Sequence, residues 1–540
     1  MGDKSGAGRK GYWLRIWYMV CFLALGIIDQ RRGSAAGAVQ MTAANMVGIV
    51  LAAMLVPSLD KDRFRHRIYM YWSALAALGG TLAAAWGWQN WLYKGQWLTG
   101  VANVVVWGYL VIYLIRGWKK LAVKEKLLRP FPLGICAMLL WMTVSVHEGI
   151  VPLWYLLLYV CWYIIGIPKE NRRDYFQGLL NGTILWFFVQ QGIAFGFRPY
   201  DYVRYRGLYA GETQNGLFYM IAYCAFICKW LWLKQEKKNR LLACGCFLMA
   251  AVCVSFTLYT GGRAPVLGIG MASAVAYIWY YLVCRKSFYR LLGRGILFVL
   301  CIAISFPVVY KAIRYFPTIL HHPIWFEGEY SEEKSVRSFD PPDSERYISF
   351  EKAFDENIGR MLSALGINWY EWKDRIKYTP WGMKVFAKEA GEPGDTPENP
   401  FRPEGIDYSS SVGVRKVIYT YYCRHLNLLG HSRAAGAFYI SEGEPVVHAH
   451  NMFLQMAYDY GIPAGILFVY LYLYSIYWTL KCCGWESKVQ VVFLVAILVF
   501  GFFEMAVVLG QITLSLLGIM FCLVGKEKEL PNKSEVPKTI

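Results

Sequence analysis

Long apolar runs recur along most of this chain of 540 residues and restrict its fold more than any other feature. A helix needs about 20 residues, within a range of about 17–25, to cross the hydrocarbon core of a bilayer. Only helices and closed barrels satisfy every backbone polar group inside lipid. Apolar residue types make up 56% of the chain and charged types only 17%. The sequence therefore predicts an all-α polytopic membrane protein with about 12–14 transmembrane helices.

The predicted spans are the runs that combine sufficient length with few charged residues. They are residues 12–28, 38–59, 68–88, 97–115, 131–147, 150–166, 176–196, 215–233, 241–259, 265–284, 295–314, 461–480, 489–508 and 510–525. A short basic segment precedes the first run, but no small-residue cleavage site follows it. We therefore expect a retained helix and not a removed signal peptide.

The net charge of +19 would suggest a nucleic-acid partner in a soluble protein, but its distribution indicates a membrane topology instead. Lys and Arg crowd both termini and alternate short loops. These loops are residues 60–67, 116–130, 168–175, 229–240, 285–294 and, more thinly, 481–488. The positive-inside rule then places both termini in the cytoplasm. The long segment between the eleventh and twelfth predicted spans has nearly balanced charges, so we expect it outside and not bound to nucleic acid.

This topology divides the chain into four parts. Residues 1–314 form a transmembrane domain of about eleven spans, and residues 315–460 form a large extracytoplasmic loop domain with amphipathic helices. Residues 461–525 form the C-terminal transmembrane helices, and residues 526–540 form a cytoplasmic tail. Within the loop domain, residues 316–411 are rich in Pro, Gly and Glu and indicate an irregular peripheral cap with one helix near 344–365.

Cysteine usage and glycine patterns exclude several classes of site. Of the 14 cysteines, only Cys423 falls in the long outer loop, so no disulfide framework and no cysteine-based zinc site is expected. The chain has neither the glycine-rich phosphate loop of nucleotide hydrolases nor that of dinucleotide-binding proteins. We therefore expect no nucleotide and no cofactor.

Residues 448–465 close the long polar segment and open a membrane helix. At about 100° per residue, polar and apolar side chains separate onto two faces, which predicts an amphipathic helix of about three turns. The polar face carries Asn451, Gln455, Tyr458 and Asp459, and the other face carries Met452, Phe453, Met456, Ala457 and Tyr460. His450 lies at the border. The histidines and Asn451 are then expected at the outer rim of the membrane, on a helix that lies against it.

The end of this helix also has a clear signal. Gly461 is suited to a left-handed cap, and Pro463 is suited to the first turn of a following apolar helix from Ile462 to about Tyr477. Further upstream, helical spacing from Val412 to Tyr422 predicts another helix, with Arg415 in its first turn.

Arginines gather on the same predicted side of the membrane. Arg204 and Arg206 belong to an aromatic-rich loop, residues 197–214, just before Asn215. Arg263 stands on a tight turn between two apolar helices, and Arg433 lies in a glycine-bearing loop. Arginine can grip phosphate with two parallel hydrogen bonds. The alternative is that these side chains contact lipid headgroups or snorkel to the interface.

The combination of Arg206, Arg263, Arg415 and the pair His448/His450 favours transfer to or from a membrane-anchored diphosphate. Arginines can offset the charge that grows on a leaving diphosphate, and a histidine can accept a proton from an attacking hydroxyl. Two alternatives stay open for the histidines. They could ligate a metal if His448 lies before the helix, although no third ligand is evident, or they could cap the helix and face headgroups. The final spans carry no motif apart from Glu504 near an outer end.

The order of these residues resembles the O-antigen ligase and polysaccharide polymerase superfamily of bacterial envelope enzymes. The similar segments are Arg206-Gly207-Leu208-Tyr209 with Asn215, Gly262-Arg263-Ala264, Val414-Arg415, Leu429-Gly430-His431-Ser432-Arg433-Ala434-Ala435-Gly436, His448-Ala449-His450-Asn451-Met452-Phe453-Leu454-Gln455 and Gly461-Ile462-Pro463-Ala464-Gly465. The His-Ala-His-Asn segment is the most specific of them. The resemblance covers roughly residues 170–510.

This resemblance implies a metal-independent, inverting glycosyltransferase of the bacterial plasma membrane. Its donor would be a glycan on a polyprenyl diphosphate such as undecaprenyl diphosphate, and its acceptor a glycan or lipid-glycan hydroxyl. It further implies that His450 is the general base or orients the acceptor, and that Arg206, Arg263 and Arg415 contact the diphosphate. His448, Asn451, Gln455, Arg433, Arg204 and Asn215 would bind substrate or support the site.

Polymerase and ligase share this pattern, and we favour a polymerase of surface polysaccharide. The alternative from another class is a flippase or exporter of the same lipid-linked glycans, which would show paired halves and charged residues deep in spans. A sensor or structural protein would leave the His-Ala-His-Asn segment unexplained.

Overall fold

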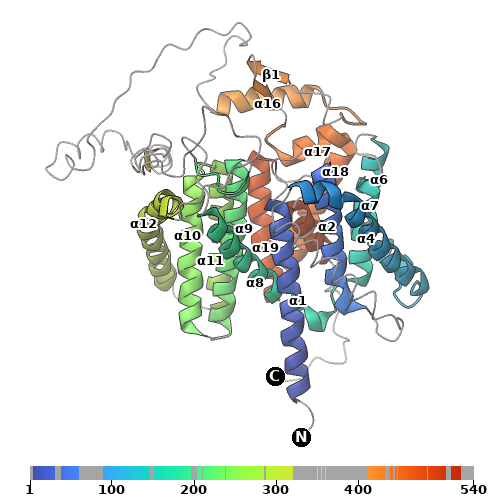
Figure 1. The fold of residues 1–540 in the computed structure, drawn as a ribbon, viewed down its shortest axis with the longest axis horizontal. Helices are drawn as coiled ribbons and strands as arrows, with labels where there is room; N and C mark the ends of the chain where they lie inside the picture. Colours follow the sequence, from blue (N-terminus) through green and yellow to red (C-terminus); the bar gives the residue numbers. More distant parts are fainter. Residues whose placement is uncertain are drawn as a thin grey trace, which may run out of the picture.

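The computed structural model shows a helical protein (Figure 1). It describes residues 4–30, 38–59, 89–145, 151–195, 204–209, 211–237, 239–284, 288–319, 350, 354–355, 359, 411–431, 438–441, 444–446, 448–482, 484–505 and 512–523. Most of the predicted cap 316–411, the predicted span 68–88 and Arg433 lie outside these residues.

Thirteen of the fourteen predicted spans overlap a helix or helices of the structure. The helices of the first half are α1 (Lys4–Gln30), α2 (Ala38–Leu55) with the short helix η1 (Val56–Ser58), α4 (Gln89–Arg116), α5 (Val123–Leu127), which lies in a predicted loop, α6 (Pro130–Val144), α7 (Val151–Ile165) and α8 (Lys169–Ala194). Next come α9 (Glu212–Gln235), α10 (Arg240–Tyr259), α11 (Arg263–Cys284) and α12 (Phe288–Ile319). The C-terminal helices are α16 (Ser411–Arg424), α17 (Met452–Tyr460), α18 (Ile462–Lys481), α19 (Trp485–Phe503) and α20 (Ile512–Leu523).

Seven helices of the described residues are long and apolar enough to cross a membrane. They are α1, α9, α10, α11, α12, α18 and α19. Shorter apolar helices occur within α2, α4, α6 and α7. The prediction of a helical, multi-pass membrane protein is confirmed at this level, while the count of 12–14 spans and the orientation of the termini stay predictions.

Helix α9 lies at the centre of one half of the bundle. It is buried along most of its length and packs against α8, α10, α11 and α19. Helices α10, α11 and α12 lie on one flank, and α2, α4, α6 and α7 lie on the other (Figure 1). This arrangement brings the ends of α9, α11 and α19 close together, although they are distant in the sequence.

Helices α1 and α8 approach each other closely because two glycines on α8 face α1. A Cβ atom on Gly182 would lie 2.6 Å from the Met19 carbonyl oxygen, and a Cβ atom on Gly178 would collide with Tyr18. Small residues spaced four apart let helix backbones approach inside a membrane, where packing replaces the hydrophobic effect as the driving force.

The segment that carries the histidines lies at one end of the bundle. Helices α16 and α17 and a two-stranded antiparallel sheet sit opposite the N-terminal end of α1 (Figure 1). The strands are β1 (Phe438–Ser441) and β2 (Glu444–Val446), with an irregular register between Tyr439 and Ser441. The all-α prediction did not include this small sheet. The predicted helix from Val412 to Tyr422 is present as α16.

The predicted helix pair at residues 448–477 is present as α17 and α18, with Pro463 in the first turn of α18. Two details of the prediction were wrong. Both histidines precede α17, because Asn451 is its N-cap. Gly461 has φ +92° and ψ 159°, an extended conformation open only to glycine, and not the left-handed helical one.

The predicted polar face of α17 does not face water. Gln455, Tyr458 and Asp459 are buried. The ring of Tyr458 lies 4.4 Å, centroid to centroid, from that of Tyr422 on α16. The helical period was predicted correctly, but α16 covers the polar face, so α17 is packed on both sides.

The glycine contact between α1 and α8 can be tested with a matched pair of alanines. Gly182→Ala places a methyl group against the α1 backbone, so we expect a lower melting temperature of the protein in detergent. At Gly192 on the same helix a Cβ atom would meet nothing within 4 Å. Alanine is favoured over glycine in helices by about 1 kcal/mol, so Gly192→Ala is expected to keep or raise the melting temperature. Equal effects of both substitutions would contradict this packing.

Candidate functional site

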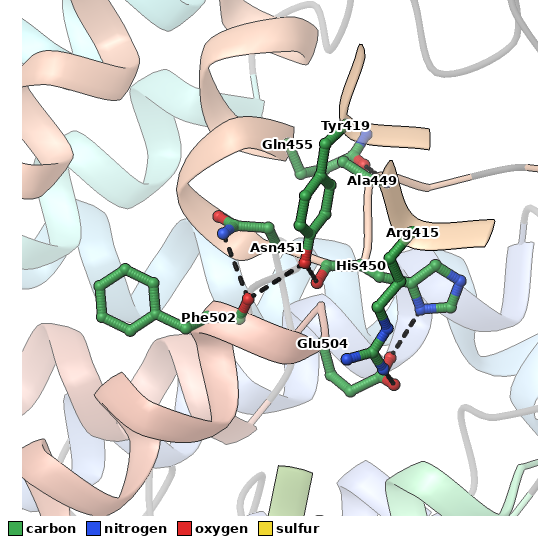
Figure 2. Close-up of polar contacts among 8 residues, drawn as sticks. All are labelled: Arg415, Tyr419, Ala449, His450, Asn451, Gln455, Phe502 and Glu504. Carbon is green, nitrogen blue, oxygen red and sulfur yellow. Dashed lines mark hydrogen bonds and ion pairs between the residues drawn. The ribbon is translucent and has the colours of Figure 1, made fainter. Parts of the chain in front are cut away.

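The C-terminal end of α19 is the point on which the site is built. Glu504 follows the last helical residue in an extended conformation, and its carboxylate is largely buried, with 15% of the side chain exposed. One oxygen accepts a hydrogen bond from Nη2 of Arg415 at 3.2 Å, and the other lies 3.0 Å from Nδ1 of His450. Figure 2 shows both side chains reaching the same carboxylate.

His450 is held in an uncommon backbone conformation. Its φ of +48° lies in the left-handed region, which few residues other than glycine adopt. The next residue, Asn451, accepts hydrogen bonds from the backbone N–H groups of Phe453 and Leu454 at 3.0 Å each, so it caps α17. The cap begins the helix immediately after His450 and thereby fixes where the imidazole projects.

Two further contacts tie this turn to α19. The Asn451 amide donates a hydrogen bond to the Phe502 carbonyl at 3.2 Å, and the Tyr419 hydroxyl on α16 lies 3.3 Å from the His450 carbonyl and 3.4 Å from that of Phe502. The last carbonyls of a helix lack partners within the helix, so these side chains satisfy one of them. Burial raises the pKa of the Tyr419 phenol, which keeps it protonated as a donor.

A buried chain of hydrogen bonds connects the histidine segment to α17. The backbone N–H of Ala449 donates to Oε1 of Gln455 at 2.6 Å, and Nε2 of Gln455 donates to Oδ1 of Asp459 at 2.7 Å. All three residues are buried. In this structure Gln455 therefore positions the backbone between the two histidines.

His448 stands directly beside His450. The two rings meet edge to face, with centroids 4.1 Å apart. Nδ1 of His448 is buried and has no hydrogen-bond partner among the described residues. Burial, and to a smaller degree the neighbouring His450, lowers the pKa of His448, so this ring is neutral near pH 7.

This geometry suits His450 to accept a proton. A neutral imidazole that donates its Nδ1–H to Glu504 presents the lone pair of Nε2. Within the part of the chain that the structure describes, Nε2 makes no hydrogen bond, and 30% of the side chain is exposed. A carboxylate behind a histidine fixes its tautomer and orientation, as in other acid–base sites.

The loop that carries Arg204 and Arg206 is fixed by internal contacts. The backbone N–H of Tyr205 donates to the Tyr259 carbonyl at 2.8 Å, and the buried amide of Asn215 donates to the Tyr205 carbonyl at 3.2 Å. Gly207 has φ +58° and passes directly over that amide. Asn215, a predicted substrate contact, therefore holds the arginine loop in place in this structure.

Arg263 belongs to the neighbouring turn. It begins α11 after Gly261, where a Cβ atom would lie 3.0 Å from Nε of Arg204. The structure thus brings the loop 204–209 and the turn of Arg263 together.

Packing between α11 and α19 places Arg263 at the level of the histidine site. A Cβ atom on Gly268 would lie 3.0 Å from the Ala496 carbonyl oxygen, and Lys488 lies over the ring of Trp279, so the helices run antiparallel. Arg263 lies five residues before Gly268 on α11. Because the helices are antiparallel and each rises about 1.5 Å per residue, this height corresponds to the position five residues after Ala496 on α19. Arg263 therefore lies about one turn from the height of Glu504.

The structure joins the predicted site residues into two neighbouring groups. His448, His450, Asn451 and Arg415 are connected through the end of α19, whereas Arg204, Arg206, Arg263 and Asn215 gather at the starts of α9 and α11. Glu504 was not predicted as a site residue. Its sequence signal is a single carboxylate at the predicted outer end of an apolar helix, which is costly in a membrane without a partner.

No group of three or more His, Cys, Asp or Glu side chains that could hold a metal occurs among the described residues. Compared with models of protein families, with curated proteins and with solved structures, the chain matches none of them.

The low pKa of His448 predicts how the stability of the protein depends on pH. Above the ordinary histidine pKa of about 6.5, both folded and unfolded states are neutral at this position. As the pH falls below that value, the unfolded chain binds a proton that the folded protein resists, so folding stability decreases. We expect the melting temperature to fall less between pH 7 and about pH 5 in His448→Gln than in the wild type.

His425→Gln provides the control for this measurement, because it removes another histidine, one that is exposed just after α16 and lacks the burial of His448. An identical pH dependence in His448→Gln and the wild type would show that His448 is not the residue responsible.

Proposed function

We propose that this protein is a membrane glycosyltransferase that moves a glycan from a polyprenyl diphosphate to a sugar hydroxyl at the outer face of a bacterial plasma membrane. The observation that carries the proposal is the Glu504–His450 pair, 3.0 Å apart, with the imidazole Nε2 left open at the end of a helical membrane bundle. Three arginines at the same end support it.

The reaction follows from these groups. Nε2 of His450 accepts the proton of the acceptor hydroxyl while the hydroxyl oxygen attacks the anomeric carbon of the donor sugar. The bond from that carbon to the diphosphate oxygen breaks on the opposite side, so the configuration inverts. The polyprenyl diphosphate leaves with the bonding electrons, and Arg206 and Arg263 offset its growing charge. This scheme uses no metal.

The remaining residues position these groups. Glu504 orients His450 and stabilises the imidazolium that forms after proton transfer. Asn451, Tyr419 and Gln455 hold the turn that presents the imidazole, and His448 forms one wall beside it. The same chemistry serves a polymerase, which extends repeat units, and a ligase, which joins a finished chain to an acceptor, and we favour the polymerase.

One observation favours the alternative of a flippase or exporter of lipid-linked glycans. Lys229 on α9 is buried and donates hydrogen bonds to Gln177 at 2.7 Å and Asn181 at 2.8 Å, both on α8. A charged residue within a bundle is typical of transport pathways. Lys229 lies less than two turns from the C-terminal end of α9, however, where a lysine can also anchor a helix at the interface.

The proposal is tested by glycan transfer in proteoliposomes that contain purified protein, lipid-linked donor and acceptor. Removal of a general base costs about 10²–10⁴-fold in rate, so His450→Ala is expected to lose transfer to that extent. Arg206→Ala is expected to lose transfer as well. In cells, both variants should accumulate unextended lipid-linked units.

His425→Ala and Arg424→Ala are the matched controls, since both residues are exposed at the end of α16 and lie outside the site. They should retain transfer. Normal transfer and normal chain lengths in His450→Ala, with translocation of lipid-linked glycan lost in Lys229→Met, would favour the transporter instead.

A further inference from the structure

Arg415 holds its carboxylate partner by one nitrogen only. Nη2 lies 3.2 Å from Glu504, longer than the roughly 2.7–2.9 Å of a strong charge-assisted hydrogen bond. The other guanidinium donors make no hydrogen bond among the described residues, and 28% of the side chain is exposed. Arg415 can therefore take a second anion, or exchange one anion for another, without breaking a strong contact.

Glu504 is shared between Arg415 and His450, one carboxylate oxygen to each. Among the residues that the structure describes, the charged or titratable groups around the imidazole are Glu504 from the end of α19, Arg415 and Tyr419 from α16, and His448 from its own segment. While Arg415 pairs with Glu504, its positive charge offsets part of the carboxylate charge. The electrostatic interaction between Glu504 and the imidazole is then weaker.

We propose that Arg415 changes partner during the reaction, leaving Glu504 for the diphosphate of the glycan donor, so that Glu504 supports His450 alone only when the donor is bound. This inference rests on the proposed function and adds regulation to its site. It makes the base fully competent only in the donor complex, and it gives Arg415 two successive roles.

The energetics favour such an exchange. A partly exposed ion pair contributes only about 0–1 kcal/mol, so leaving Glu504 costs little. A diphosphate carries more negative charge than a carboxylate and offers several oxygens to the planar fork of arginine. The competing explanation is that the Arg415–Glu504 pair only ties α16 to α19.

The exchange predicts that removing the carboxylate charge improves donor binding while it slows transfer. Binding of farnesyl diphosphate, a short polyprenyl diphosphate, is measured on the full chain in lipid nanodiscs. Glu504→Gln is expected to bind this probe about fivefold more tightly than the wild type, the factor that matches about 1 kcal/mol. The same variant should transfer glycan more slowly, because His450 loses its carboxylate.

A double-mutant cycle separates the exchange from a general effect of charge. In an Arg415→Gln background the Glu504→Gln substitution should improve probe binding by less than about twofold, because no arginine is released. Glu486→Gln removes the same charge at the opposite end of α19 and should leave binding unchanged. An equal improvement with and without Arg415 overturns the exchange, and so does a loss of binding in Glu504→Gln.

Substitutions of Arg206 and Arg263 show whether a negative result contradicts only the exchange of Arg415 or also the proposed function. One outcome is that Arg206→Gln and Arg263→Gln weaken probe binding while the effects of Arg415→Gln and Glu504→Gln simply add. In that case the proposed donor site is supported and only the exchange is wrong. If none of the arginine variants changes probe binding, the donor site itself is wrong. Should Glu504→Gln not insert into membranes, Glu504→Asp retracts the carboxylate from Arg415 and is expected to tighten probe binding in the same direction, to a smaller extent.

Discussion

The carboxylate of Glu504, at the C-terminal end of α19, is the constraint on which the rest of the site depends. It lies at the edge of a long apolar helix, where an isolated charge is unfavourable, and its partners come from two other parts of the chain. Arg415 arrives from α16 and His450 from the turn before α17. The neighbouring Phe502 carbonyl accepts hydrogen bonds from that same turn. One helix end therefore fixes the position of an imidazole and a guanidinium together.

The bundle below provides the rigidity that this arrangement needs. Helix α9 is buried among α8, α10, α11 and α19, and the antiparallel contact of α11 with α19 sets the height of Arg263 relative to Glu504. Because membrane helices are already formed by their own backbone hydrogen bonds, close packing fixes mainly how they are shifted along one another. That shift decides whether the arginine loops and the histidine turn lie at one level.

Local patterns in the sequence were sufficient for some of this architecture. The amphipathic period of residues 451–460 and the Gly461-Ile462-Pro463 junction predicted α17 and α18, because backbone preferences act over a few residues. Local patterns could not predict that α16 covers the polar face of α17, because this is a tertiary contact. The four-residue strand β1 is too short for its alternation to be distinguished from a loop.

The meeting of His450 with Glu504 was likewise beyond local patterns, since 54 residues separate them and Glu504 stands alone in its segment. The chemistry of the residues, together with the resemblance to envelope glycosyltransferases, gave the histidine and arginines as candidates, whereas the carboxylate came from the structure. Arg415 shows the difference most clearly. It was predicted as a diphosphate contact, yet here it is paired with a residue to which no role had been assigned.

The most direct measurement is a cryo-electron microscopy structure of the protein in a lipid nanodisc with a polyprenyl-diphosphate glycan bound. We expect the diphosphate to lie between Arg206 and Arg263 and within reach of Arg415, with the anomeric carbon of the first sugar within reach of a hydroxyl hydrogen-bonded to Nε2 of His450. A diphosphate bound away from these arginines, or an imidazole turned away from the sugar, would contradict it.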